Sequence, residues 1–158
     1  MQTTINVEQA FGIAGEIYDL TPYRVDAREV ATTATFGGVA GVSAAGAYGT
    51  MGTTYPTFAG IFVRPKEEVS YGTVTVTGND GTANPLAPTL TVPAGRTVQI
   101  MSMGRVVVAK PTGVWADGAA LYITSAGVFT TDSSGNTLIG KIVKGGASAD
   151  TLAVVQIG

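Results

Sequence analysis

AALYITSAGVFTTDSSGNTLIGKIV, residues 119–143, is the stretch that decides the fold class of this 158-residue chain. Its β-branched and aromatic residues gather in short runs at 119–124, 127–131 and 138–143. Ser125-Ala126 separates the first two runs and Ser133-Ser134-Gly135-Asn136 the last two, and both spacers have turn composition. The stretch therefore predicts short strands joined by tight turns.

The same pattern continues outward on both sides of this stretch. Further β-type runs lie at 58–63, 71–77, 96–101, 104–109 and 152–157. In the run at 71–77, Thr and Val alternate with period two, which is typical of a half-buried strand. Short strands at regular spacing, with no amphipathic helix, predict an all-β protein with a single-domain β-sandwich or barrel.

The N-terminal third differs from the rest in composition. Residues 1–35 carry acidic residues interleaved with Arg24 and Arg28, and we expect them to form an extended N-terminal arm or peripheral strand, with at most one helical turn at 26–30. Residues 36–158 are then the β-barrel or β-sandwich domain. Within it, residues 37–57 are uncharged and rich in Gly, Ala, Ser and Thr, which predicts a long loop.

The composition argues against an enzyme, a metal site and a cofactor. The chain has no His and no Cys, so the commonest general base, metal ligand and thiol nucleophile are all missing. Carboxylates at Asp19, Asp26 and Glu29 are interleaved with arginines, which favours ion pairs over a catalytic pair. The oxygen-rich segments 79–81 and 132–136 fit ordinary turns better than calcium loops.

Charge and hydropathy argue against nucleic acid and membranes as partners. The net charge is −2 and there is no run of Lys or Arg, so the counterion-release term of nucleic-acid binding has no source. The uncharged stretch 30–63 is interrupted by Gly, Ser, Thr and Pro56, which is unlike a membrane-spanning helix.

The composition favours a protein that binds other protein surfaces. Only 13% of the residues are charged, so much of the surface is inexpensive to desolvate. Tyr and Arg are typical anchors of protein interfaces. We therefore expect a binding surface formed by residues of the arm and of the long loop, namely Phe11, Tyr18, Tyr23, Arg24, Tyr48 and Tyr55. A lone Trp beside strands, Trp115, fits the edge of a core better than an exposed anchor.

Several motifs from residue 92 onward resemble the structural cement proteins of tailed bacteriophages. They are GRVVV at 104–108, DGAALY at 117–122, GVFT at 127–130, IGKIV at 139–143 and LAVV at 152–155. The likeness of residues 11–19 and 58–65 to the front half of that family is weaker, and Phe62 replaces a small residue there.

This resemblance implies a virion protein of the outer capsid surface, made in the host cytoplasm. It would bind the major capsid protein and bridge neighbouring capsid subunits, and it would act as a small homo-oligomer, with a trimer favoured. Two alternatives stay open on the sequence alone: another phage structural β protein, such as a tail or fibre component, and a carbohydrate-binding β-sandwich module.

Overall fold

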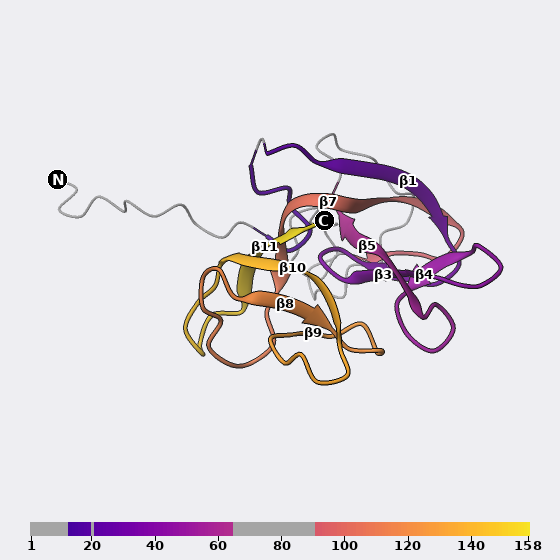
Figure 1. Cartoon of the computed structure of the whole chain (residues 1–158). Helices are drawn as coiled ribbons and strands as arrows, with labels where there is room; N and C mark the ends of the chain where they lie inside the picture. Colours follow the sequence, from indigo (N-terminus) through magenta and orange to yellow (C-terminus); the bar gives the residue numbers. More distant parts are fainter. Residues whose placement is uncertain (1–12, 20, 65–90) are drawn as a thin grey trace, which may run out of the picture.

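The computed structural model describes residues 13–19, 21–64 and 91–158, and all the regular secondary structure in these ranges is β-strand. The strands are β1 (Arg24–Val30), β2 (Ala34–Thr35), β3 (Val39–Val42), β4 (Tyr48–Thr50), β5 (Thr57–Val63), β6 (Thr91–Val92), β7 (Arg96–Ala109), β8 (Ala120–Ile123), β9 (Phe129–Thr130), β10 (Thr137–Lys144) and β11 (Leu152–Ile157) (Figure 1). The all-β prediction is confirmed. The strand predicted at 71–77 lies outside the described residues.

One long strand, β7, connects the two halves of the molecule. Its first half is antiparallel to β1 and β5, and its second half is antiparallel to β11. The sequence predicted two strands here, at 96–101 and 104–109. They form a single strand of 14 residues, in which a register shift opposite Arg24 and Val25 is followed by Gly104 with a φ of 131°.

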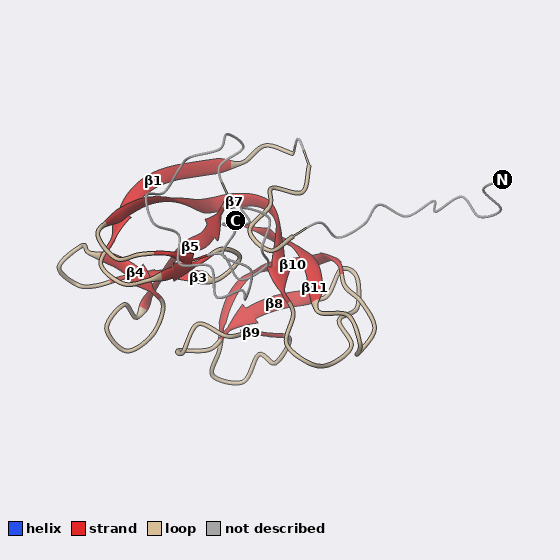
Figure 2. Cartoon of the chain, turned by 180° about the vertical axis from the view of Figure 1, so that it is seen from behind, coloured by secondary structure: helices blue, strands red, loops and turns tan. Residues whose placement is uncertain are grey.

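Nine of the strands in the described residues form one sheet, in the order β1-β4-β3-β5-β7-β11-β10-β8-β9. An additional pairing of β1 with β7 closes the first part of this sheet into a small barrel. Figure 2 shows β1, β3, β4 and β5 on one side of the molecule and β8 to β11 on the other, with β7 between them. A separate two-stranded ribbon is formed by β2 and β6.

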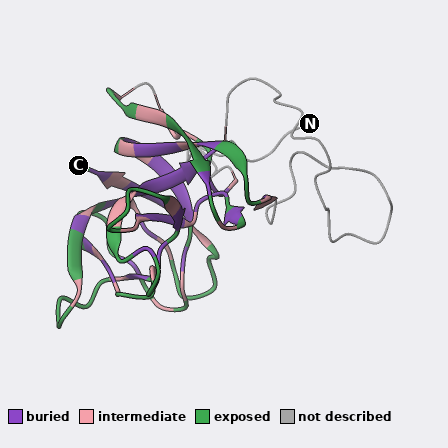
Figure 3. Cartoon of the chain, turned by 90° about the vertical axis from the view of Figure 1, so that its right-hand side faces the viewer, coloured by how far each residue is buried: buried purple, intermediate pink, exposed green. Residues whose placement is uncertain are grey.

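Strand alternation divides the buried side chains between two hydrophobic clusters. On β5, Ile61 and Val63 belong to one cluster and Phe62 to the other, and all three are fully buried at 0% exposure. Figure 3 shows that the buried segments of the described chain lie mainly in its interior and the exposed segments on its outside. Trp115 belongs to the larger cluster at 5% exposure, in agreement with its expected place at a core. Burying side chains of this size stabilises a fold by about 1.5–3 kcal/mol each.

The prediction of a long loop at 37–57 is wrong, because β3 and β4 form an antiparallel hairpin there. Its small residues allow close packing against Tyr55. A Cβ at Gly41 would lie 2.1 Å from the carbonyl oxygen of Tyr55, and one at Gly49 would lie 2.6 Å from the Tyr55 ring. The glycines that indicated a loop are therefore required by a tightly packed hairpin.

Residues 24–30 also differ from their expected structure. They form β1, a strand of the barrel antiparallel to β7 along its full length, rather than a helical turn in a peripheral arm. Val30 at the end of β1 is fully buried in the smaller cluster. Backbone pairing with β7 outweighs the low strand propensity of the charged residues in this segment.

The bend of β7 yields a test of the fold. Gly104 has a φ of 131°, and a Cβ there would lie 2.6 Å from the Cβ of Tyr23. Gly104→Ala should lower the free energy of unfolding by about 2–4 kcal/mol, through backbone strain and steric overlap together, as measured by urea denaturation.

Gly113→Ala is the matched control, because Gly113 has a φ of 127° and open space around its missing Cβ. This substitution should lower the free energy of unfolding through backbone strain alone, by about 1–2 kcal/mol. Equal losses of unfolding free energy in Gly104→Ala and Gly113→Ala would contradict a steric role for Tyr23.

Candidate functional site

The segment at residues 13–19 lies along β7 as an additional extended partner. Gly15 N donates to Val107 O at 2.8 Å, Val107 N donates to Glu16 O at 2.9 Å, and Tyr18 N donates to Arg105 O at 3.0 Å. An isolated antiparallel bridge joins Ile17 to Val106. This segment therefore occupies the edge of β7 opposite β11, and both edges of the second half of β7 are paired.

A second attachment of the segment comes from the end of β5. Arg64 N donates to Gly15 O at 2.7 Å, and Arg64 Nε donates to Ala14 O at 2.9 Å. The Arg64 guanidinium also lies over the Phe36 ring, 5.1 Å from its centroid. Burial lowers the pKa of this guanidinium, and the charge of Glu16 raises it in part. The backbone around residues 14–16 is thus held from two directions.

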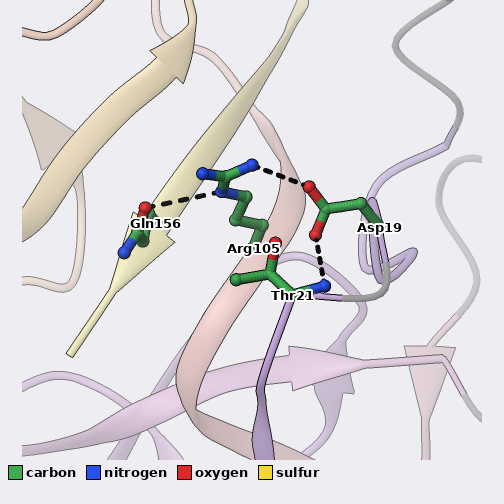
Figure 4. Close-up of polar contacts among 4 residues, drawn as sticks. All are labelled: Asp19, Thr21, Arg105 and Gln156. Carbon is green, nitrogen blue, oxygen red and sulfur yellow. Dashed lines mark hydrogen bonds and ion pairs between the residues drawn. The ribbon is translucent and has the colours of Figure 1, made fainter.

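Polar side chains fasten the other end of the segment (Figure 4). Arg105 Nη1 donates to Asp19 Oδ2 at 2.8 Å, while Arg105 Nε donates to Gln156 Oε1 at 3.4 Å. Thr21 N donates to Asp19 Oδ1 at 3.0 Å. The hydrogen bonds from Thr21 hold the pKa of Asp19 below its usual value, and Arg105 adds to this effect against the desolvation of the carboxylate. The network connects the segment to β7 and β11.

Three of the predicted surface residues lie near the bend of β7. Tyr18 is half-buried and donates to the Arg105 backbone, whereas Tyr23 is 42% exposed and covers Gly104. Arg24 is exposed, pairs in register with Met103, and has its Nε 3.8 Å from Asp26 Oδ2. The structure thus brings these three predicted residues together.

The other predicted residues are placed elsewhere. Tyr48 is half-buried at the far end of β1, where it pairs with Val30 and its ring centroid lies 5.2 Å from Arg28 Cζ. Tyr55 is only 8% exposed and packs inside the hairpin of β3 and β4, so it does not offer a binding surface. Phe11 lies outside the described residues.

Sequence reasoning missed Met103, which is 44% exposed on the same bend as Tyr23. Met101 and Met103 have the same strand parity, yet Met101 is fully buried. Two features coincide with this difference: β5 pairs with β7 only as far as Met101, and a register shift in the pairing with β1 separates Met101 from Met103. The sequence carries no signal for either feature, since both depend on distant strands.

The described part of the chain contains neither a cluster of metal-ligating side chains nor a helix that could span a membrane. Within residues 13–19, 21–64 and 91–158, no group of three or more His, Cys, Asp or Glu side chains is arranged to hold a metal ion. The same residues contain no helix long and apolar enough to cross a membrane. The bend presents the exposed ring of Tyr23, which directly precedes β1, the thioether of Met103 on β7 and the guanidinium of Arg24 on β1. Such a combination is suited to contact with another protein.

The whole chain, residues 1–158, matches a family model described as "Structural cement protein (E217 gp24/Pam3 gp6)". Among solved structures, one similar chain belongs to "The capsid of Myoviridae Phage XM1", with a TM-score of 0.62 and 19% sequence identity. The match covers 99% of this chain and 96% of that one, and at this identity it concerns the fold alone. None of the curated proteins matches the sequence.

The Asp19–Arg105 pair yields a prediction for acid stability. Because the pKa of Asp19 is lowered in the folded state, its contribution is present above the unfolded value, about 3.9, and is lost as pH falls through the folded value. Asp19→Asn should therefore destabilise the protein by about 0.5–1 kcal/mol at pH 7, and the deficit should vanish in strong acid.

Urea denaturation across the acidic range measures this difference. A double-mutant cycle with Arg105→Gln should assign about 0.5–1 kcal/mol of coupling to the pair at neutral pH. A deficit of Asp19→Asn that stays constant from neutral pH into strong acid would contradict the assignment.

Proposed function

The chain belongs to the structural cement protein family of phages, and from this premise we propose that it binds the outer surface of a tailed-phage capsid and bridges neighbouring major capsid subunits. The family implies a structural rather than a catalytic role in the capsid. The observation that carries the proposal is the family match over the whole chain, residues 1–158, rather than over a single motif. The matching fold of a chain from a phage capsid supports it.

The physical character of the fold agrees with such a role. A bridging subunit must transmit load between its neighbours without unfolding, and here a closed barrel and a second group of strands share β7. The second half of β7 is paired along both edges, by β11 and by the segment at 13–19. Binding surfaces on rigid strands also lose little conformational entropy when they are covered.

We place the capsid-contacting surface around the bend of β7. It consists of Tyr23 and Met103, which are 42% and 44% exposed, with Arg24 and the half-buried Tyr18 beside them. Aromatic and Arg side chains with apolar neighbours are the usual anchors of protein interfaces. Phe11 and Tyr48 remain candidates for secondary contacts, whereas the burial of Tyr55 removes it from the surface.

The proposal includes self-association. We expect a small homo-oligomer, and the family resemblance implies a trimer. Such an oligomer would present several copies of one modest patch to the repeating capsid surface. Linked copies gain effective concentration without any new contact, so each individual patch can be weak. The virion, on the outside of the head, is then the site of action after synthesis in the host cytoplasm.

Co-sedimentation with expanded, undecorated heads of the phage that encodes it tests the capsid proposal. The protein should pellet with these heads at micromolar concentration, and loss of a central aromatic anchor in Tyr23→Ala should weaken binding at least about tenfold. Failure to co-sediment would refute a cement role for this chain.

Val128→Ala is the matched control for the contact surface. Val128 is 50% exposed but lies in the turn between β8 and β9, away from the bend of β7. Its truncation should leave head binding unchanged. Equal losses in Val128→Ala and Tyr23→Ala would contradict the proposed surface.

A further inference from the structure

Met103 has the most accessible side chain among the described methionines. The chain contains four methionines and no Cys. Three of the methionines lie in the described residues, where Met51 is 7% exposed, Met101 is 0% exposed and Met103 is 44% exposed. Peroxides oxidise the thiols and thioethers that solvent reaches. Because no thiol competes for the oxidant, Met103 is the first target that a peroxide meets among these three.

Met101 and Met103 differ in what surrounds them. A Cβ placed on Gly104 would lie 3.2 Å from Met101 Sδ, so the sulfur of this buried side chain packs against the backbone of its own strand. A Cβ placed on Gly158 would lie 2.8 Å from Met103 Cγ and 3.1 Å from Met103 Cβ. The inner part of the Met103 side chain thus packs against Gly158, and we assign its exposed area to the thioether beyond.

Met103 has two of the proposed capsid anchors as neighbours. Arg24 pairs in register with Met103 across β1 and β7. Side chains directly opposite each other in an antiparallel pair lie on one face, with Cβ atoms about 4.5–5.5 Å apart. The Arg24 guanidinium is loosely held, since its Nε lies 3.8 Å from Asp26 Oδ2 and its side chain is 71% exposed. The second neighbour is Tyr23, which covers the adjacent Gly104.

Oxidation by a peroxide converts the thioether into a sulfoxide. The sulfur of Met103 attacks one peroxide oxygen with its lone pair, so that an S–O bond forms and the O–O bond breaks. The displaced oxygen takes up the proton left on the transferred oxygen and departs as water. Sulfur loses two electrons in this step and the peroxide gains them.

A sulfoxide is ill suited to an apolar contact. A thioether is soft and apolar, whereas the S–O group is a polar hydrogen-bond acceptor that water solvates in the free protein. Covering this acceptor without a donor costs free energy, because its bonds to water are lost. Arg24 can donate to the new oxygen only with a guanidinium that is then withdrawn from the capsid contact.

We propose that Met103 is a site of reversible oxidation, and that its sulfoxide weakens capsid binding by unbound copies of the protein. Copies already on the capsid are protected, because the contact covers the thioether. The selectivity for Met103 rests on the chain alone, whereas the effect on binding rests on the proposed cement role. Reduction by two thiols returns the thioether and releases water and a disulfide, a reaction that methionine sulfoxide reductases catalyse.

Mass spectrometry of the peroxide-treated chain tests the selectivity. Cleavage after Arg96 and Arg105 releases residues 97–105, which contain both Met101 and Met103. Brief treatment with dilute hydrogen peroxide should oxidise Met103 at least about tenfold faster than Met101, as fragmentation of this peptide measures. In Met103→Leu the same peptide should stay unoxidised over the same time. Equal oxidation of the two methionines would overturn the proposal.

Co-sedimentation with undecorated heads tests the effect on binding. The oxidised wild-type chain should bind heads at least about tenfold more weakly than the untreated chain. Methionine sulfoxide reductases for both epimers, supplied with a thiol, should restore binding. Met103→Leu is compared with its own untreated sample, and peroxide should leave its affinity for heads unchanged. The urea midpoint of the oxidised wild-type chain should equal that of the untreated chain.

Heads that are decorated before the peroxide is added test the protection. On these heads Met103 should be oxidised at least about tenfold more slowly than in the free protein, as measured on the peptide 97–105. Equal rates on and off the heads would overturn the placement of Met103 in the contact.

Three further outcomes would overturn the effect on binding. These are a sulfoxide at Met103 that leaves head binding unchanged, an equal loss of binding in peroxide-treated Met103→Leu, and a lowered urea midpoint, which would assign the loss to unfolding. An untreated protein that does not bind heads would refute the cement role and this effect with it. The selectivity for Met103 is decided by the peptide masses alone, so the two failures are distinguishable.

Discussion

The structure depends on the backbone pairing of β7, the strand that both groups of strands share. Its first half lies between β1 and β5, and its second half lies between β11 and the extended segment at 13–19. Nearly every backbone polar group of a strand in this position must be paired, because an unpaired buried group costs about 1–3 kcal/mol. Gly104, with a φ of 131°, lies where the partners of β7 change, since the pairing with β1 reaches Met103 and the pairing with β11 begins at Gly104.

The sequence predicted those elements in which side-chain pattern and backbone pairing agree. The strands at 58–63, 138–143 and 152–157 have apolar residues that meet a core, and β5, β10 and β11 lie there. It failed where small residues serve packing. Gly41 and Gly49 indicated a loop, but they permit the close approach of Tyr55, a contact that no local pattern reveals.

The candidate site was predicted in part, and for the same reason. Tyr18, Tyr23 and Arg24 come together because their segment lies along β7, although the sequence indicated only an exposed arm. The burial of Tyr55 follows from the hairpin packing and the exposure of Met103 coincides with the end of β5, both of which are tertiary features.

The shared strand has a mechanical consequence. A force applied along the direction of β7 loads the hydrogen bonds to β1, β5 and β11 in shear, so many must break together rather than one after another. Resistance to such a force depends on the height of the unfolding barrier and not on the equilibrium stability alone. The protein therefore has a stiff axis along β7 and a softer direction at right angles to it, where β1 and β4 meet through a single residue pair. The orientation of the molecule relative to the load then decides how much tension it can bear.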